Sequence, residues 1–268
     1  MTSFVSTPVL IGFGINILVS IGLPIGLMIF LLVKRQKIMV PLLTGAAVFV
    51  VSQLILRSGM LNLIGLTPMA AWLQKSIWIY AIFLGLTAGL FEEFGRLIGF
   101  RCLKTRRSWM DGIAFGIGHG GIESILLVGL SNINGLANSL ALNSGVLESI
   151  SQAAGLPQET IQQLIAQLTS YDLPTVLMGG LERVFTLPVQ IALTLLVLFS
   201  IRSRKPAWLV LAIGLHLLID SGVVLLQAEF HWNLFAIEAV IGLFAAAALI
   251  FIFRSKKTLF AEKIQGNA

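Results

Sequence analysis

The sequence predicts an all-α fold, a polytopic membrane bundle of about seven transmembrane helices. The first observation is composition: of the 268 residues, 57% are hydrophobic and 11% are charged, whereas a soluble domain has roughly 25% charged residues. The second is a series of apolar stretches, each close to the length of about 20 residues that crosses a bilayer. The third is that basic residues gather in alternate loops between these stretches. The composition excludes a soluble enzyme and a disordered chain, and the single cysteine, Cys102, excludes internal disulfides and Cys-based zinc clusters.

The apolar stretches give the predicted spans in chain order. They are residues 8–33, 41–66, 76–100, 110–131, 176–200, 207–228 and 233–253. The first is too long for the core of a signal peptide, so it is predicted to be retained as a helix. No linker or low-complexity tract divides the chain, so residues 1–268 are predicted to form one integral-membrane domain.

The stretch 132–175 is polar and is predicted to be an extracytoplasmic loop. Pro157 suits the first position of a helix within it. Four apolar residues would then share one face of that helix. They are Ile161, Leu164, Ile165 and Leu168. Such a helix either lies on the membrane surface or over a cavity mouth, or it packs as a cap between spans.

Lysine and arginine follow the odd-numbered spans. These residues are Lys34, Arg35, Lys37, Arg101, Lys104, Arg106, Arg107, Arg202, Arg204, Lys205, Arg254, Lys256, Lys257 and Lys263. Of the other loops, only one contains a basic residue, Lys75, and 132–175 contains none. Because basic loops stay in the cytoplasm, the N-terminus is predicted outside and the C-terminus inside. The same bias accounts for the net charge of +6, so no nucleic-acid partner is expected.

Ionisable residues interrupt the third, fourth and sixth predicted spans. They are Glu92, Glu93, Arg96, His119, Glu123, His216 and Asp220. Each intramembrane charge costs about 2.5–3.5 kcal/mol on insertion scales, so such groups face the protein interior or a wet cavity. At 1.5 Å per residue, Glu92 lies about 12 Å, the two histidines about 14 Å, and Glu123 and Asp220 about 20 Å from the cytoplasmic ends. This common depth predicts one polar layer in a cavity that opens from the cytoplasmic half.

Two further features bear on this layer. Gly112, Gly116 and Gly120 recur on one face of the fourth span, and small residues at this spacing let membrane helices approach closely. Arg57, in the second span, lies nearer the outer face and is predicted to form a structural ion pair with Glu182 of the fifth. A gating role for Arg57 is the alternative.

The ordered set of polar residues resembles a known protease pattern. Glu92-Glu93-x-x-Arg96, Phe115-x-x-x-His119 and His216-x-x-x-Asp220 resemble the motifs of type II CAAX prenyl endopeptidases, the bacteriocin-processing CPBP group and PrsW-like proteases. The extension His119-Gly-Gly-Ile-Glu123 and the seven-span layout are most similar to the YhfC family of intramembrane proteases. The chain departs from the wider group at Asp220, where many relatives have Asn.

This resemblance implies an intramembrane endopeptidase of a bacterial plasma membrane that cleaves membrane-embedded or membrane-anchored peptides or proteins. Glu92, Glu93, His119 and His216 would be catalytic, with one glutamate activating water and the histidines orienting it or stabilising the oxyanion. Arg96, Glu123 and Asp220 would support them. The spacing does not distinguish which glutamate is the base.

The favoured mechanism is glutamic and requires no cofactor. In the alternative, a zinc-dependent mechanism, the metal ligands would be His119, Glu123, His216 and Asp220. The helix carrying His119 has no HExxH motif, and the two histidines lie on different spans.

Two other function classes fit the same residues. Intramembrane acids and histidines also form proton relays, so a proton-coupled transporter is one alternative, although the sequence has no evident inverted repeat. The other is a non-catalytic membrane partner, such as an immunity factor, that retains the polar core.

Overall fold

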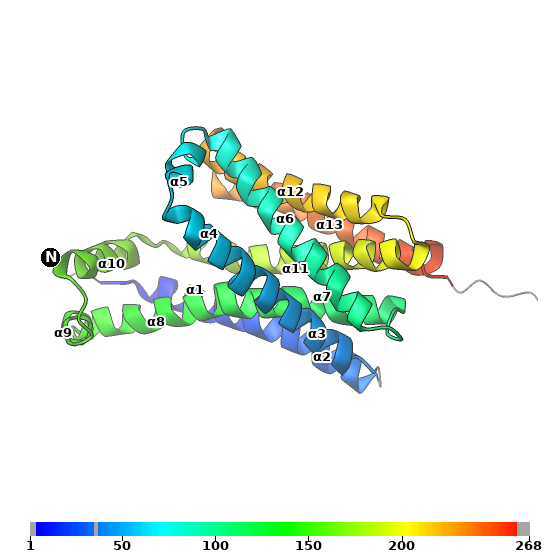
Figure 1. The fold of residues 1–268 in the computed structure, drawn as a ribbon. Helices are drawn as coiled ribbons and strands as arrows, with labels where there is room; N and C mark the ends of the chain where they lie inside the picture. The colour runs from blue at the N-terminus through cyan, green and yellow to red at the C-terminus, as the bar shows by residue number, and fades with distance from the viewer. Residues whose placement is uncertain (1–3, 35–36, 262–268) are drawn as a thin grey trace, which may run out of the picture. The chain divides into compact units, whose positions relative to one another are not determined.

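The computed structural model describes residues 4–34 and 37–261, and every regular element in these ranges is helical (Figure 1). The elements are α1 (Thr7–Ile17), η1 (Leu18–Gly22), α2 (Leu23–Val33), α3 (Met39–Phe49), η2 (Val50–Arg57), α4 (Ser58–Gly65), α5 (Pro68–Leu73), α6 (Ile77–Cys102), α7 (Trp109–Glu123), η3 (Ser124–Gly129), α8 (Leu130–Asn143), α9 (Leu147–Ala153), α10 (Gln158–Ser170), α11 (Leu173–Ser203), α12 (Ala207–Ala228) and α13 (Leu234–Thr258). Two of the basic residues used to predict orientation, Arg35 and Lys263, lie outside the described ranges.

Seven helical runs in the described chain are long and apolar enough to cross a membrane, which confirms the predicted fold class. They are Thr7–Val33, Met39–Gly65, Ile77–Cys102, Trp109–Asn143, Leu173–Ser203, Ala207–Ala228 and Leu234–Thr258. The protein is therefore a multi-pass membrane protein. The fourth run differs most from its predicted span, because it continues to Asn143 rather than ending at 131. Its polar residues bond to their own helix, since Asn132 donates to the Val128 carbonyl at 2.8 Å and Ser139 to the Gly135 carbonyl at 2.6 Å.

Three runs contain segments of wider, π-helical turns, labelled η1, η2 and η3. Pro24 follows η1 and has no backbone N–H to continue the α-helical ladder. The second segment ends at Arg57, and the third begins directly after Glu123. Such turns are rare in proteins, and those that occur often lie at functional sites.

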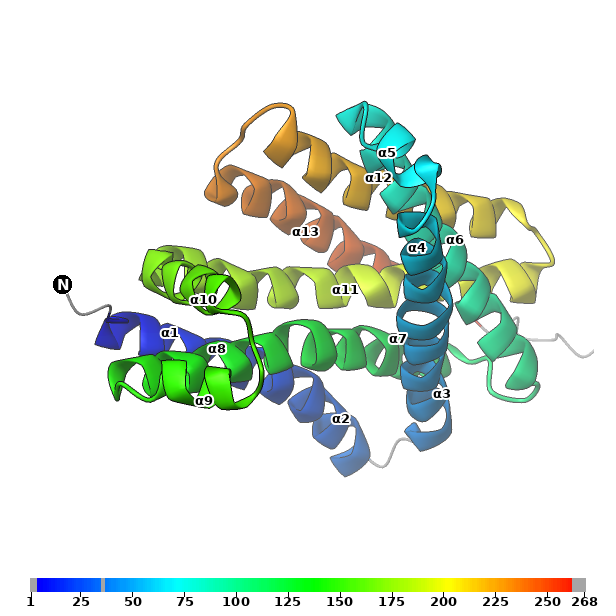
Figure 2. The same cartoon turned by 60° about the vertical axis from the view of Figure 1, so that its left-hand side comes forward.

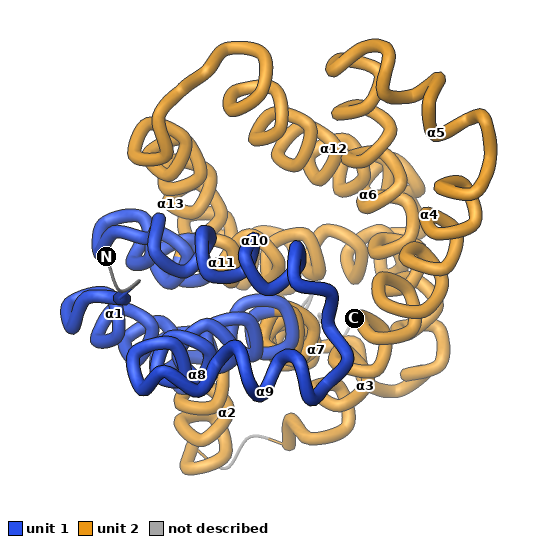
Figure 3. The backbone as a smooth tube through the Cα atoms, turned by 90° about the vertical axis from the view of Figure 1, so that its left-hand side faces the viewer, with its two compact units in different colours: residues 1–23, 124–184 blue, residues 24–123, 185–268 orange. Residues whose placement is uncertain are grey.

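The chain divides into two compact units, coloured in Figure 3, and each is described by itself. Unit 1 comprises Met1–Leu23 and Ser124–Val184. Its apolar core consists of Val5, Val9, Phe13, Leu147, Ile161, Ile165, Leu168 and Val176. The helix predicted within 132–175 is α10, which begins at Gln158 with Pro157 as its N-cap. Because Ile161, Ile165 and Leu168 lie inside this core, the apolar face of α10 packs against protein.

Unit 2 comprises Pro24–Glu123 and Phe185–Ala268. Within it, α6 packs along α12 and α3 packs across α7 (Figures 1 and 2). Glycines permit both contacts: a Cβ atom at Gly85 would lie 2.9 Å from the Leu217 carbonyl oxygen, and one at Gly118 would overlap the Leu42 carbonyl. The α6–α12 contact brings the Glu92-Glu93 pair beside His216.

Candidate active site

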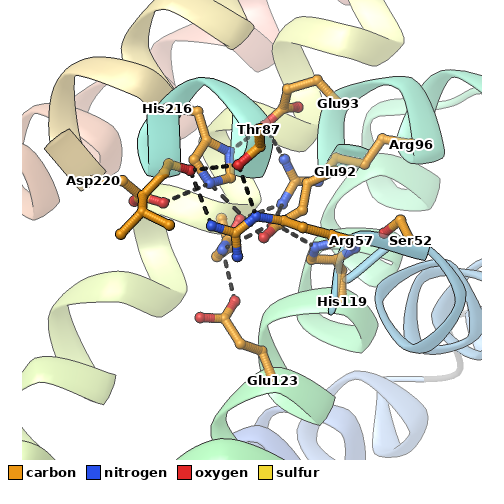
Figure 4. A network of polar contacts seen from close by, with 12 residues as sticks. Ser52, Arg57, Thr87, Glu92, Glu93, Arg96, His119, Glu123, His216 and Asp220 are labelled. Carbon is orange, nitrogen blue, oxygen red and sulfur yellow. Dashed lines mark hydrogen bonds and ion pairs between the residues drawn. The ribbon is translucent and has the colours of Figure 1, made fainter. Parts of the chain in front are cut away.

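One polar network in unit 2 contains every site residue predicted from the sequence (Figure 4). Helix α6 supplies Glu92, Glu93 and Arg96, α7 supplies His119 and Glu123, and α12 supplies His216 and Asp220. Five of the seven are buried: Glu93, Arg96 and His119 at 0% exposure, Glu92 at 3% and His216 at 4%. A cluster of ionisable groups is thus enclosed among apolar helices.

Arg96 is the internal counter-ion of the network. Its Nη2 atom lies 3.1 Å from Glu92 Oε2, and its Nη1 atom forms an ion pair with Glu93 Oε1. These contacts follow from the i, i+4 and i, i+3 spacing on one helix. Arg96 Nη2 also donates to Gln190 Oε1 of α11. The planar guanidinium therefore holds three side chains at once, which a lysine ammonium could not do in the same geometry.

Glu92 lies between the two histidines. Its Oε2 atom is 3.0 Å from His119 Nε2, and its Oε1 atom is 3.9 Å from His216 Nε2. The three side chains come from three different helices, α6, α7 and α12. The carboxylate of Glu92 is thus the group on which both imidazoles converge.

Glu93 has a different place, behind His216. Its Oε1 atom lies 2.7 Å from His216 Nδ1 and also pairs with Arg96. When Glu93 is ionised it can only accept, so Nδ1 carries the proton and the ring orientation is fixed. His216 Nε2 then faces Glu92 and also Asp220, whose Oδ2 atom is 3.5 Å away.

Gln190 of α11 belongs to the network and was missed by the sequence analysis, which considered ionisable residues only. Its Nε2 atom donates to Glu123 Oε2 at 2.6 Å and lies 3.5 Å from Glu92 Oε2. Depth could have identified it: Gln190 lies 12 residues before Arg202, about 18 Å along the helix, which is the same layer as Glu123.

Arg57 is the second cation of the polar network (Figure 4). The sequence predicts an ion pair between Arg57 and Glu182, whereas the Arg57 Nε atom donates to Thr87 Oγ1 at 3.2 Å and its Nη2 atom to the Leu84 carbonyl at 3.0 Å. Both acceptors are neutral and lie on α6. Arg57 is therefore anchored beside the acidic residues without a direct carboxylate contact among the described residues.

The network combines acids, bases and imidazoles. Four carboxylates (Glu92, Glu93, Glu123 and Asp220), two guanidinium groups (Arg57 and Arg96) and two imidazoles lie in it. Carboxylates and imidazoles are groups that can exchange protons or bind a cation.

The imidazoles and carboxylates of the network are groups that could bind a zinc ion. Two imidazoles with carboxylates are ligands that zinc accepts, and two ligands of a tetrahedral zinc lie about 3.3 Å apart. The separations of His119 Nε2 from Glu92 and of His216 Nε2 from Asp220, 3.0 and 3.5 Å, are close to this value. Glu93 also supplies the carboxylate behind His216 that is usual behind a zinc-bound histidine. Among the described residues no three such donors surround a single point, so the set fits zinc in its chemistry but is not pre-assembled.

Comparison with known proteins identifies the family. The family model described as YhfC intramembrane metalloprotease matches residues 19–241, which include the whole network. A relative described as an uncharacterized membrane protein YhfC, from Bacillus subtilis (strain 168), is 35% identical over 242 residues, covering 88% of this chain and 92% of its own. No solved structure matches the chain. The chain belongs to the YhfC intramembrane metalloprotease family.

Proposed function

We propose that this protein is an endopeptidase that hydrolyses peptide bonds of membrane-embedded or membrane-anchored substrates in a bacterial plasma membrane. The family supports a protease, and the network supplies acids and imidazoles within the apolar layer. The observation that carries the proposal is the convergence of His119 Nε2 and His216 Nε2 on the carboxylate of Glu92.

Glu92 is the general base in this proposal. It takes a proton from water as the water oxygen attacks the carbonyl carbon of the peptide. When the C–N bond breaks, the same carboxylic acid returns the proton to the leaving amine. Proton transfer by a positioned side chain contributes about 10²–10⁴-fold to the rate.

Glu93 is a positioning residue rather than the base. Its Oε1 atom accepts from His216 Nδ1 and pairs with Arg96. It holds His216 with Nε2 directed toward the reacting atoms. When His216 is protonated on both ring nitrogens, its Nε2–H can donate to the oxyanion as it forms, and His119 orients the water.

A metal-dependent version is the second candidate, favoured by the family description. His119 and His216 would hold the ion together with Glu92 or Asp220. A bound zinc ion supplies a Lewis acid and lowers the pKa of its water. The remaining carboxylate would then accept the proton, and Glu93 would still orient His216.

Membrane proteomics tests the proteolytic function. Cells that produce the Glu92→Gln protein should accumulate intact membrane peptides that are cut in cells producing the unaltered protein. Glu159→Gln is the matched control, because Glu159 is exposed on α10 in unit 1. Identical peptide profiles for the unaltered and Glu92→Gln proteins would favour a non-catalytic membrane partner.

Metal analysis separates the two mechanisms. The metal-dependent mechanism predicts about one zinc per chain in purified protein, lost in His216→Ala and retained in Glu159→Gln. The glutamic mechanism predicts proteolysis that survives complete chelation and still requires Glu92.

A further inference from the structure

We infer that the site opens toward the helix ends that lie away from the basic loops, and that it receives a peptide segment from that side of the membrane. This is the reverse of the cavity direction expected from the sequence. The substrate part of this inference rests on the proposed protease function, whereas the direction of access does not.

The end of the network nearest the basic loops is sealed. One helical turn toward those loops from four residues of the network, each on a different helix, the next residue on the same face is fully buried. Phe100 follows Arg96, Phe115 precedes His119, Thr194 follows Gln190 and Ala212 precedes His216, and each of these four is 0% exposed. Phe100 and Phe115 stack with ring centroids 4.3 Å apart, and Leu195 and Leu198 of α11 are also 0% exposed. Water and a peptide chain cannot pass through a layer packed in this way.

The opposite end is open. One turn beyond His216 and His119 lie Asp220 and Glu123, and neither is buried. The Asp220 side chain is 42% exposed, against 5% for the His216 side chain that it faces. Arg57, at the end of η2, is also only partly buried. These three residues come from three helices and define the rim of the site.

The exposure of Asp220 is to the inside of unit 2 and not to lipid. The lipid-facing side of α12 is marked by Leu211 and Leu218, which are 44% and 55% exposed. Asp220 lies two residues after Leu218, about 200° around the helix axis, and it faces His216. An exposed carboxylate on the inward face of a membrane helix indicates a water-filled opening.

The rim selects the kind of ligand. Two carboxylates and a guanidinium would lose hydration if an acyl chain filled the opening, at a cost that no apolar contact replaces. A peptide backbone and its polar side chains can bond to these groups. Asp220 lies eight residues before the end of α12, about 12 Å along the axis. About four residues of extended chain span that distance, so the cleaved segment must be unwound there.

Cysteine accessibility tests the direction of access. The native chain has one cysteine, Cys102, which is exposed at the basic-loop end of α6 and reports on that side. In a Cys102→Ser background, Asp220→Cys and Glu123→Cys are expected to react with a membrane-impermeant maleimide from the opposite side, tested in intact cells and inverted vesicles. Ala212→Cys, in the sealed layer, is expected to react from neither side.

Three results would overturn the inference: labelling of both rim cysteines from the Cys102 side, labelling of neither, or labelling of Ala212→Cys from the Cys102 side. Two rim positions on different helices guard against one variant failing to fold, which gel filtration would show. Labelling requires no turnover. If the Glu92→Gln and unaltered proteins give identical peptide profiles while the rim cysteines label as expected, the protease proposal is wrong and the direction of access still stands.

Discussion

Both units of the molecule join their helices through buried polar groups, but the chemistry of these groups differs. In unit 1, Asn16 donates to Asn132 Oδ1 at 3.1 Å and to the Val176 carbonyl, and Ser124 donates to the Ser20 carbonyl at 2.9 Å. These groups are neutral, although unit 1 also contains the buried Arg183, which pairs with the adjacent Glu182 of the same helix. In unit 2 the corresponding groups are carboxylates, guanidiniums and imidazoles.

Neutral hydrogen bonds between helices and buried ions between helices differ in their energetic cost. Neutral hydrogen bonds between membrane helices contribute on average about 0.6 kcal/mol each and can be lost without leaving a charge. Buried ions require several kcal/mol of compensation, so ionisable residues within membrane helices mark candidate functional sites. Four substitutions test this contrast, and they are given in order of decreasing expected loss of stability or activity.

Loss of the internal counter-ion should have the largest effect. Arg96→Met leaves Glu92 and Glu93 without their shared cation, and breaking a buried pair costs about 3–5 kcal/mol. Thermal unfolding of detergent-purified protein should show a much lower midpoint. The double variant Arg96→Met/Glu93→Gln removes one of the stranded charges and should regain part of the loss. An unchanged midpoint for Arg96→Met would show that the pair is not a structural requirement.

Loss of the base should abolish turnover while the fold is kept. Glu92→Gln retains shape and hydrogen-bonding capacity but cannot take a proton, so cleavage should fall about 10³-fold. The rate is measured on a substrate identified by the proteomic comparison. Asn16→Ala in unit 1 is the matched change at a buried polar residue and should leave that rate within about threefold. Equal losses in the two variants would contradict the contrast between the units.

A larger side chain at the contact between α3 and α7 should destabilise the protein without changing an ionisable group. Gly118→Val places a side chain against the Leu42 carbonyl, and overpacking of this kind costs about 1–3 kcal/mol. Gly26→Val is the control, because a Cβ atom at Gly26 meets nothing within 4 Å. Thermal unfolding should therefore distinguish the two variants, and similar midpoints would argue against close packing at Gly118.

Removal of the neutral hydrogen bonds of Asn16 in unit 1 should cause the smallest loss of stability. Asn16→Ala removes two hydrogen bonds, for an expected loss of about 1 kcal/mol. A double-mutant cycle with Asn132→Ala isolates the part due to their direct bond. A coupling energy as large as the loss of unfolding free energy in Arg96→Met would contradict the distinction between neutral hydrogen bonds and buried ion pairs.

Sequence periodicity and composition were sufficient to predict the membrane helices. The sixth span, 207–228, coincides with α12, and the others differ by a few residues at their ends, except for the fourth. The difference arises at polar residues such as Asn132, because their polarity is visible in the sequence and the bond of Asn132 to the Val128 carbonyl of its own helix is not.

The site was predicted less completely. Depth along the helices indicated that Glu92, His119 and His216 share a layer, because charged residues in lipid must face inward. The different contacts of Glu92 and Glu93 depend on which side of α6 meets α12, and adjacent positions in a sequence do not show that. Arg57 was placed elsewhere because its acceptors are Thr87 and a backbone carbonyl, which carry no charge signal.

Helix α6 brings its own counter-ion into the membrane. Because Arg96 is spaced to reach both Glu92 and Glu93 on a single helix, most of the neutralisation is available before any other helix arrives. The segment can thus partition from the translocation machinery with one unbalanced charge in place of three separate ones. The histidines and Gln190 then need only be delivered later, as the remaining helices assemble around a polar group that is already tolerated by the bilayer.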